Sequence, residues 1–91
     1  MGEVARSIED KLNAAFAPSR LEVVDDSARH AGHSGARAGG ESHFNVTIVA
    51  SAFAGESRVQ RQRRIHSALH EELAGPVHAL SIKAFAPGEQ A

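Results

Sequence analysis

The first apolar residues of the chain recur at helical spacing. The stripe is formed by Val4, Ile8, Leu12, Ala15 and Phe16. Successive intervals of four, four, three and one residues place these side chains along one side of a helix. Pro18 cannot continue a helix because it lacks a backbone N–H. The pattern therefore predicts an amphipathic helix that ends just before Pro18.

Two strands are predicted after this helix. Residues 21–24 are a short apolar run that stops at Asp25, Asp26 and Ser27. Residues 43–49 alternate with a period of two, which predicts that Phe44, Val46 and Ile48 lie on the buried face of a strand. Residues 28–41 are rich in Gly, Ala, Ser, His and Arg and show no periodicity, so they are expected to form a long loop.

A second helical region is predicted between about residues 57 and 73. Ser57 offers a cap, a break near residues 60–62 could split the region into two helices, and Gly75-Pro76 ends it. Its apolar face is expected to consist of Val59, Ile65, Ala68, Leu69 and Leu73. A last strand follows from Val77 to about Phe85.

The order of elements is therefore α-β-β-α(α)-β, which is typical of an α+β fold. We expect one three-stranded mixed sheet with helices on one face. The first two strands should be antiparallel, and the return through a helix favours a parallel, right-handed crossover to the last strand. Ninety-one residues suffice for a single domain with a modest core.

Composition excludes several classes of protein. The formal net charge of −1 gives no global field for nucleic acid or an anionic membrane. No apolar run approaches the roughly 20 residues that span a bilayer, and the N-terminal residues do not look like an export signal. We therefore expect a cytoplasmic protein that does not bind membranes. Neither a nucleophile motif nor a nucleotide-binding fingerprint is present, so no catalytic activity is expected.

Histidine is the residue type in this chain with the most potential for chemistry. There are six histidines and no cysteine. Three lie in or beside the Gly-rich stretch (His30, His33 and His43), and three lie in the C-terminal third (His66, His70 and His78). Any role with a soft metal must rest on imidazole, helped by a partner that supplies sulfur.

Several short motifs follow one another along the chain. They are Leu21-Glu22-Val23-Val24-Asp25-Asp26-Ser27, His30, Glu41-Ser42-His43-Phe44, Phe53-Ala54-Gly55, Arg61-Gln62-Arg63, Glu71-Glu72-Leu73 and Val77-His78-Ala79-Leu80. Taken in this order, they resemble the BolA family, in the subtype with a histidine in its loop. The resemblance covers nearly the whole chain, from about Val4 to Phe85. We expect a single domain over residues 1–91, with an ordered core at about 3–85, a loop at 28–42 and a polar tail at 86–91 that frays. The resemblance also implies a class II KH-like fold without the Gly-x-x-Gly loop that clamps nucleotides in KH domains.

The same resemblance implies partners and a cofactor. BolA-like proteins form heterodimers with monothiol glutaredoxins, bridged by a [2Fe-2S] cluster, in cluster trafficking or in iron and redox regulation. The family's invariant histidine falls on His78, and the second ligand comes from the loop. That ligand is His33 or alternatively His30. We favour His33, because Gly32 and Gly35 leave its backbone free to swing.

With no thiolate of its own, the chain is expected to hold the cluster only together with glutaredoxin and glutathione, and to carry none alone. The isolated chain should be a monomer or a weak dimer.

Each histidine also has a purely structural interpretation. His78 shares strand parity with Leu80 and Ile82, which would make it a partly buried residue at a sheet end. His43 is expected to act locally on its strand. His66 and His70 lie four apart on a helix, a spacing that can bind zinc, but a solvated polar face is the favoured interpretation.

A basic cluster supports an alternative function. It consists of Arg58, Arg61, Arg63 and Arg64, which are four arginines within seven residues. Family members are also described as transcriptional regulators that bind DNA through a helix-turn-helix-like part, and these arginines at a helix start could contact phosphate. A third interpretation is that the cluster forms a basic surface close to His78 and docks an acidic patch or a glutathione carboxylate of the partner.

Overall fold

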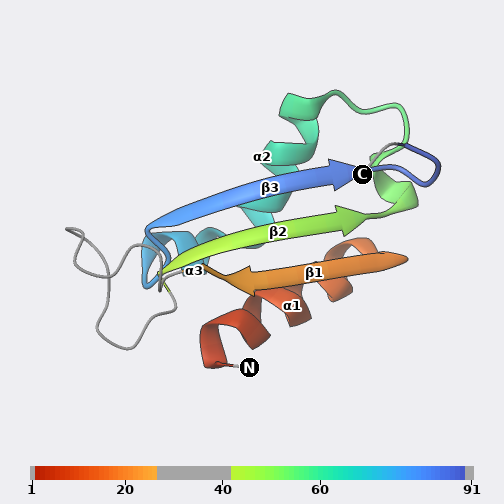
Figure 1. Ribbon diagram of the computed structural model, residues 1–91. Helices are drawn as coiled ribbons and strands as arrows, with labels where there is room; N and C mark the ends of the chain where they lie inside the picture. Colours follow the sequence, from red (N-terminus) through yellow and green to blue (C-terminus); the bar gives the residue numbers. More distant parts are fainter. Residues whose placement is uncertain (1, 27–41, 90–91) are drawn as a thin grey trace.

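The computed structural model describes residues 2–26 and 42–89 (Figure 1). These residues form, in order, α1 (Glu3–Phe16), β1 (Arg20–Asp25), β2 (His43–Val49), the 3₁₀ turn η2 (Ser51–Phe53), α2 (Arg58–Ala68), α3 (His70–Ala74) and β3 (Ala79–Phe85). The predicted α-β-β-α(α)-β order is confirmed.

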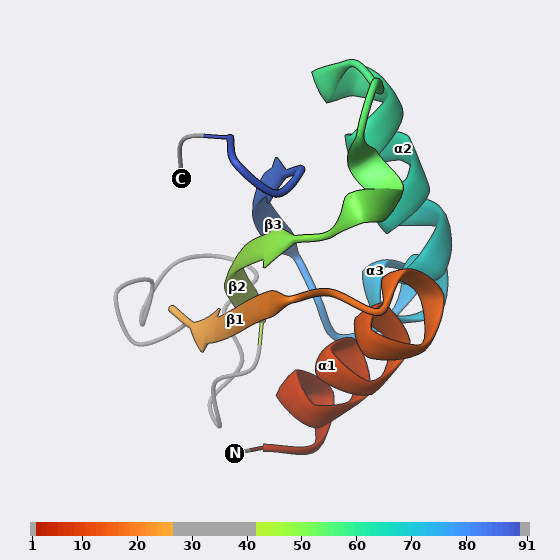
Figure 2. The same cartoon turned by 90° about the vertical axis from the view of Figure 1, so that its right-hand side faces the viewer.

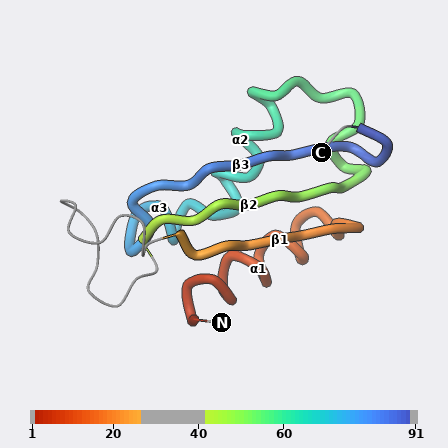
Figure 3. Tube along the Cα trace, viewed as in Figure 1, coloured from red at the N-terminus to blue at the C-terminus, as the bar shows by residue number. Residues whose placement is uncertain are grey.

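The strands of the described residues form one mixed sheet in the order β1-β2-β3. As predicted, β2 pairs antiparallel with β1 and parallel with β3. The alternation in β2 is also confirmed, since Phe44, Val46 and Ile48 are all buried. Figure 2 shows the helices gathered on one side of the sheet. α1 runs beside β1, and α3 lies at the end of the sheet where β2 and β3 begin (Figure 3).

Helix α1 follows the predicted stripe with one correction. Its buried residues are Ala5, Ile8, Leu12 and Phe16, while Ala15 is exposed. Ala15 lies three residues after Leu12 and one before Phe16. At 100° per residue, this places it at the edge of the buried stripe and not within it. Ala17 ends the helix in a left-handed conformation with φ of 45°, and its N–H donates to the Asn13 carbonyl.

The second helical region departs from the prediction in two ways. Ser57 caps α2 as expected, in a reciprocal pair of hydrogen bonds with Gln60. The break falls at Leu69, however, and not near residues 60–62. Val59 is 56% exposed, whereas Arg61 lies on the buried face. At 100° per residue, Val59 is about 120° from Ile65 around the helix axis, whereas Arg61 is only about 40° from it. This explains why Arg61, and not Val59, lies on the buried face.

The end of the chain also differs from expectation. β3 begins at Ala79, so Val77 and His78 precede the strand. Val77 is buried and His78 is exposed, which speaks against the alternative, purely structural interpretation of His78 as a partly buried strand residue. Residues 86–89 are held against the domain, because Glu89 is bonded to Arg61 and to the Ala86 N–H. Of the loop predicted at 28–42, only Ser42 lies within the described residues, and it is buried.

Candidate functional site

His78 occupies a fixed backbone position with a free side chain. Its N–H donates to the Ser42 carbonyl over 2.8 Å, and the next N–H, of Ala79, reaches the same oxygen at 3.2 Å. The imidazole is exposed and makes no hydrogen bond with any other described residue. His78 can therefore present a ring nitrogen outward without any change in the fold.

The chain segment that carries the predicted loop ligands begins and ends beside His78. The Asp26 N–H donates to the His43 carbonyl over 2.8 Å, and Ser42 accepts the bond from His78. Residues 26 and 42 thus lie at the same end of the sheet as His78. His30 and His33 lie outside the described residues. Counted from Asp26, an extended chain would reach roughly 13 Å at His30 and roughly 23 Å at His33, so chain length permits both alternatives.

The other histidines stand apart from this arrangement. His43 is half-buried, and its Nδ1 lies 3.0 Å from the Ser42 hydroxyl, in keeping with a local role on its strand. His66 and His70 are both exposed, as expected for a solvated face, and the break at Leu69 places them in different helices. Among residues 2–26 and 42–89, no three His, Asp or Glu side chains come together as metal ligands.

Two of the four clustered arginines are bound within the fold. The Arg61 side chain is buried, and it donates from Nε to the Glu56 carbonyl at 3.1 Å and from Nη1 to the Ala84 carbonyl at 3.0 Å. Both of its Nη atoms also bond the Glu89 carboxylate, at 2.6 and 2.9 Å. Those contacts hold Arg61 between α2, β3 and the tail.

Arg64 is held in a similar way by η2 and its flanks. Its Nη1 donates to the Ala52 carbonyl and to the Glu56 carboxylate, each over 2.9 Å. The guanidinium also lies 5.2 Å from the centre of the Phe16 ring, a cation-π contact. Arg58 and Arg63, by contrast, are exposed and form no ion pair with another described residue. They are the members of the cluster that are open to a partner.

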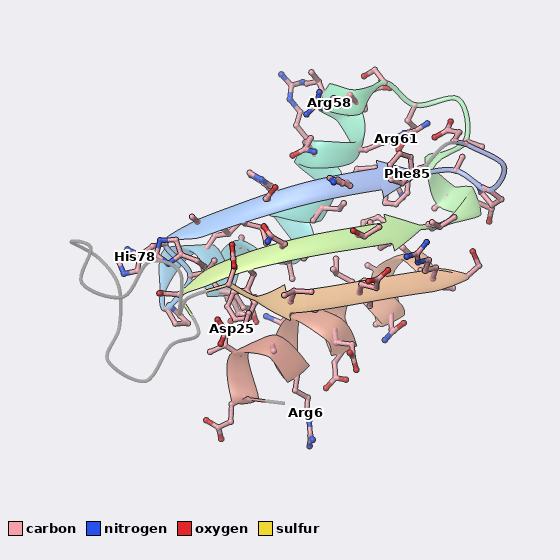
Figure 4. All side chains as sticks on the ribbon, viewed as in Figure 1. Arg6, Asp25, Arg58, Arg61, His78 and Phe85 are labelled. Carbon is pink, nitrogen blue, oxygen red and sulfur yellow. The ribbon has the colours of Figure 1, made fainter. Side chains whose placement is uncertain are left out.

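The basic cluster and His78 lie at opposite ends of β3. Figure 4 shows Arg58 and Arg61 toward Phe85, with His78 at the other end of the sheet. Arg61 bonds Ala84 near the end of β3, and His78 precedes its first residue. Six residue steps along a parallel strand span about 20 Å. The expectation that the basic surface lies close to His78 is therefore wrong.

Sequence reasoning missed the groove between α2 and β3. It has a volume of about 620 Å³, and its polar lining includes Arg58, Arg61, Gln62, Lys83 and Glu89. Glu89 comes from the tail that was expected to be free. The one local signal was Pro87-Gly88, a dipeptide typical of a turn that brings the chain back on itself.

Comparison with known proteins identifies the family. A family profile described as "BolA-like protein" matches residues 12–89. The chain belongs to the BolA-like family. It is 48% identical over 88 residues to BolA-like protein 1 of Mus musculus, covering 97% of this chain and 61% of the mouse protein. It is also 48% identical over 82 residues to a protein of Escherichia coli (strain K12) named DNA-binding transcriptional regulator BolA, covering 90% of this chain and 74% of that protein.

The BolA-like fold is confirmed by solved structures. The BolA domain of SufE1 from Arabidopsis thaliana superposes with a TM-score of 0.89 at 44% identity and covers 99% of both chains. The class of fold predicted from the sequence is thus the one observed in this family. In the described part of the chain, every helix is too short or too polar to cross a membrane. A cytoplasmic location stays a prediction.

Proposed function

We propose that this BolA-like chain is an adaptor that binds a monothiol glutaredoxin and shares a [2Fe-2S] cluster with it. His78 would supply one imidazole ligand, and His33 or His30 the second. Glutaredoxin and glutathione would supply the two thiolates. The role would lie in cluster trafficking or in iron and redox regulation, without catalytic activity of the chain itself.

One observation carries the proposal. The His78 imidazole is exposed and without a hydrogen bond among the described residues, while its backbone is clamped to Ser42. A histidine that is buried for packing normally has its ring nitrogens hydrogen-bonded to the protein. His78 instead offers its nitrogen to the outside, beside both ends of the segment that carries His30 and His33.

The donor chemistry of the chain fits half of a cluster site. A [2Fe-2S] cluster takes four ligands, and two imidazoles can replace two thiolates on one of its irons. With six histidines and no cysteine, this chain can supply imidazole but not thiolate. The chain therefore needs a thiol-bearing partner to complete the set, which matches the predicted heterodimer.

The test is to mix the chain with cluster-loaded monothiol glutaredoxin. Visible absorption and circular dichroism report the ligand set, and gel filtration reports the heterodimer. His78→Ala should remove the heterodimer's spectrum and shorten the cluster lifetime by at least about tenfold, because loss of even a residue that only orients a metal ligand typically costs about 10–100-fold in affinity. His66→Ala is the matched control, because it removes another exposed imidazole, one that lines the surface of α2 together with Arg58 and Arg63. An unchanged spectrum with His78→Ala would contradict the ligand assignment.

The same assay separates the two loop candidates. His33→Ala and His30→Ala are compared singly and together. If His33 is the ligand, the single His33→Ala change should alter the spectrum and His30→Ala should not. Equal, partial effects of the two would indicate that either histidine can take the position.

DNA binding is a second candidate, supported by the name of the Escherichia coli relative. Arg58 and Arg63 also support it, because both project from α2 without a partner among the described residues. Arg61 and Arg64 are not included, since their guanidiniums are already hydrogen-bonded to other residues of the chain. The relevant surface would then be the exposed side of α2.

Salt dependence provides the test of this second candidate. Replacing Arg58 and Arg63 by Gln should weaken DNA binding and reduce the slope of log K against log salt by about 2. Arg6→Gln is the matched control, because Arg6 is exposed on α1, far from Arg58 (Figure 4). Binding that depends equally on Arg6 would show that no particular surface is used.

A further inference from the structure

The groove between α2 and β3 contains an arginine that is held in place for a carboxylate. Two of the three nitrogens of Arg61 are bonded to backbone carbonyls, those of Glu56 and Ala84. These bonds fix the plane and direction of the guanidinium, because rotation of the side chain would break its hydrogen bonds to the two backbone carbonyls. The Nη edge that remains is the one that pairs with a carboxylate in two parallel bonds.

In this structure the carboxylate comes from the chain's own tail. Glu89 accepts from Nη1 and Nη2 of Arg61 and from the Ala86 N–H, at 2.6, 2.9 and 2.8 Å. The Glu89 side chain is still 42% exposed, while that of Arg61 is 11% exposed. The receptor is therefore built into the fold, whereas its occupant sits at the surface and can leave without uncovering the core.

The surroundings of Arg61 favour a negatively charged guest. Arg58 and Lys83 line the same groove, are exposed, and form no ion pair with another described residue. Glu56 is paired with Arg64 and so adds little opposing charge. Ile82, Ala84 and Phe85 give the groove an apolar side.

We propose that this groove is a binding site for an acidic peptide segment of a partner protein, and that Glu89 occupies it in cis until such a segment displaces it. The incoming carboxylate would take the paired bonds of Arg61 and the Ala86 N–H. Neighbouring acidic residues would lie near Arg58 and Lys83. The site is distinct from the His78 end of the sheet and does not depend on a cluster.

The geometry favours a carboxylate over nucleic acid. Glu89 shows that a planar carboxylate fits between Arg61 and Ala86, and the apolar side of the groove suits a peptide. Addition of a β-strand is not the expected mode, because the outer carbonyls of Ile82 and Ala84 already accept from Gln62 and Arg61. Recognition would therefore run through side-chain carboxylates.

The experiment follows the ¹⁵N signals of the Arg61 Nε–H and the Ala86 amide during titration of the full chain. The probes are a capped peptide of five alternating Glu and Asp residues and its Gln/Asn counterpart. Glu89→Gln should bind the acidic peptide at least about fivefold more tightly than the wild type, because the tethered competitor is gone. The neutral peptide should move neither signal. Lys83→Gln, added to Glu89→Gln, should weaken binding of the acidic peptide.

Each contrary result overturns the proposal. Equal affinity of wild type and Glu89→Gln would mean that Glu89 does not occupy a ligand site. Equal shifts with the neutral peptide, or none with the acidic peptide up to about 10 mM, would mean that the groove does not recognise carboxylates. A DNA duplex that shifts the same signals at lower concentration than the peptide would assign the groove to nucleic acid. Unchanged amide signals elsewhere in Glu89→Gln confirm that the variant is folded. Binding of glutaredoxin through His78 is measured in its own assay, so failure of one proposal is distinguishable from failure of the other.

Discussion

At the scale of single residues, the buried carboxylate of Glu72 shows how a charge is tolerated inside the fold. Burial by itself raises the pKa of Glu72, but hydrogen bonds from Lys11 and Ser7 outweigh it and hold the pKa below its ordinary value. The Ser7 hydroxyl donates over 2.5 Å and Lys11 Nζ over 2.8 to 3.0 Å. These contacts tie α1 to α3, so Glu72 links two elements that are distant in the sequence.

Ser7→Ala tests this link. Loss of a hydrogen bond to a buried charged group should lower the free energy of unfolding by about 1–2 kcal/mol at neutral pH. Urea unfolding measures the change. Ser81→Ala removes an exposed hydroxyl from β3 and should stay within about 0.5 kcal/mol. If the two variants are equally stable, the bond from Ser7 contributes nothing net.

Glu89 gives a pH dependence of stability. The paired hydrogen bonds from Arg61, and then the Ala86 N–H, lower the pKa of Glu89 from 4.5 to about 2. Well above pH 4.5 the Glu89 carboxylate is ionised in both folded and unfolded chains, and its stabilising contribution is complete. As the pH falls from 4.5 to about 2, the unfolded chain takes up a proton first, so the contribution is lost.

Thermal unfolding of wild type and Glu89→Gln between pH 7 and pH 2 measures this loss. The wild type should be the more stable at neutral pH, and the difference should shrink over that acid range. A ¹³C titration of the Glu89 carboxyl gives its pKa directly. A midpoint near 4.5 would show that the pair with Arg61 is not formed in solution.

At the scale of elements, the sequence predicts well where one local pattern decides the outcome. β2 alternates as predicted because every second residue meets the helices on a single covered face. α2 was predicted less well because an apolar residue, Val59, was assigned to the buried face in place of Arg61. Burial of Arg61 depends on Ala84 and Glu89, more than twenty positions along the chain. No local pattern contains that information.

The start of α2 provides the prediction at this scale. Ser57 and Gln60 form the reciprocal cap, so Ser57→Ala should destabilise the protein by about 1 kcal/mol. Chemical denaturation monitored by circular dichroism measures the change. Ser67→Ala is the control, because Ser67 is an exposed position near the other end of the same helix, where alanine is favoured. A loss with Ser67→Ala as large as that with Ser57→Ala would show that the cap is not the cause.

At the scale of the whole molecule, the sheet separates two surfaces that the sequence seemed to place together. His78 lies where β2 and β3 begin, while Arg58 lies toward the other end of β3 (Figure 4). One interpretation of the sequence put the arginine cluster on a surface close to His78, but α2 and β3 run in a way that separates them. Whether His30 or His33 joins His78 is a matter of residues outside the described ranges, so that choice stays a prediction.

Separation of the surfaces predicts that their functions are independent. His78→Ala should abolish cluster-dependent binding of glutaredoxin but leave DNA and acidic-peptide binding unchanged. Replacement of Arg58 and Arg63 should weaken DNA binding but leave glutaredoxin binding unchanged. In the combined variant the free energy of DNA binding should match that of the arginine variant to within about 0.5 kcal/mol, because sites more than 10 Å apart without shared partners seldom couple. Binding titrations of all four proteins measure the coupling. A larger coupling would require β3, which is the direct connection between the two ends, to change its pairing or position when either partner binds.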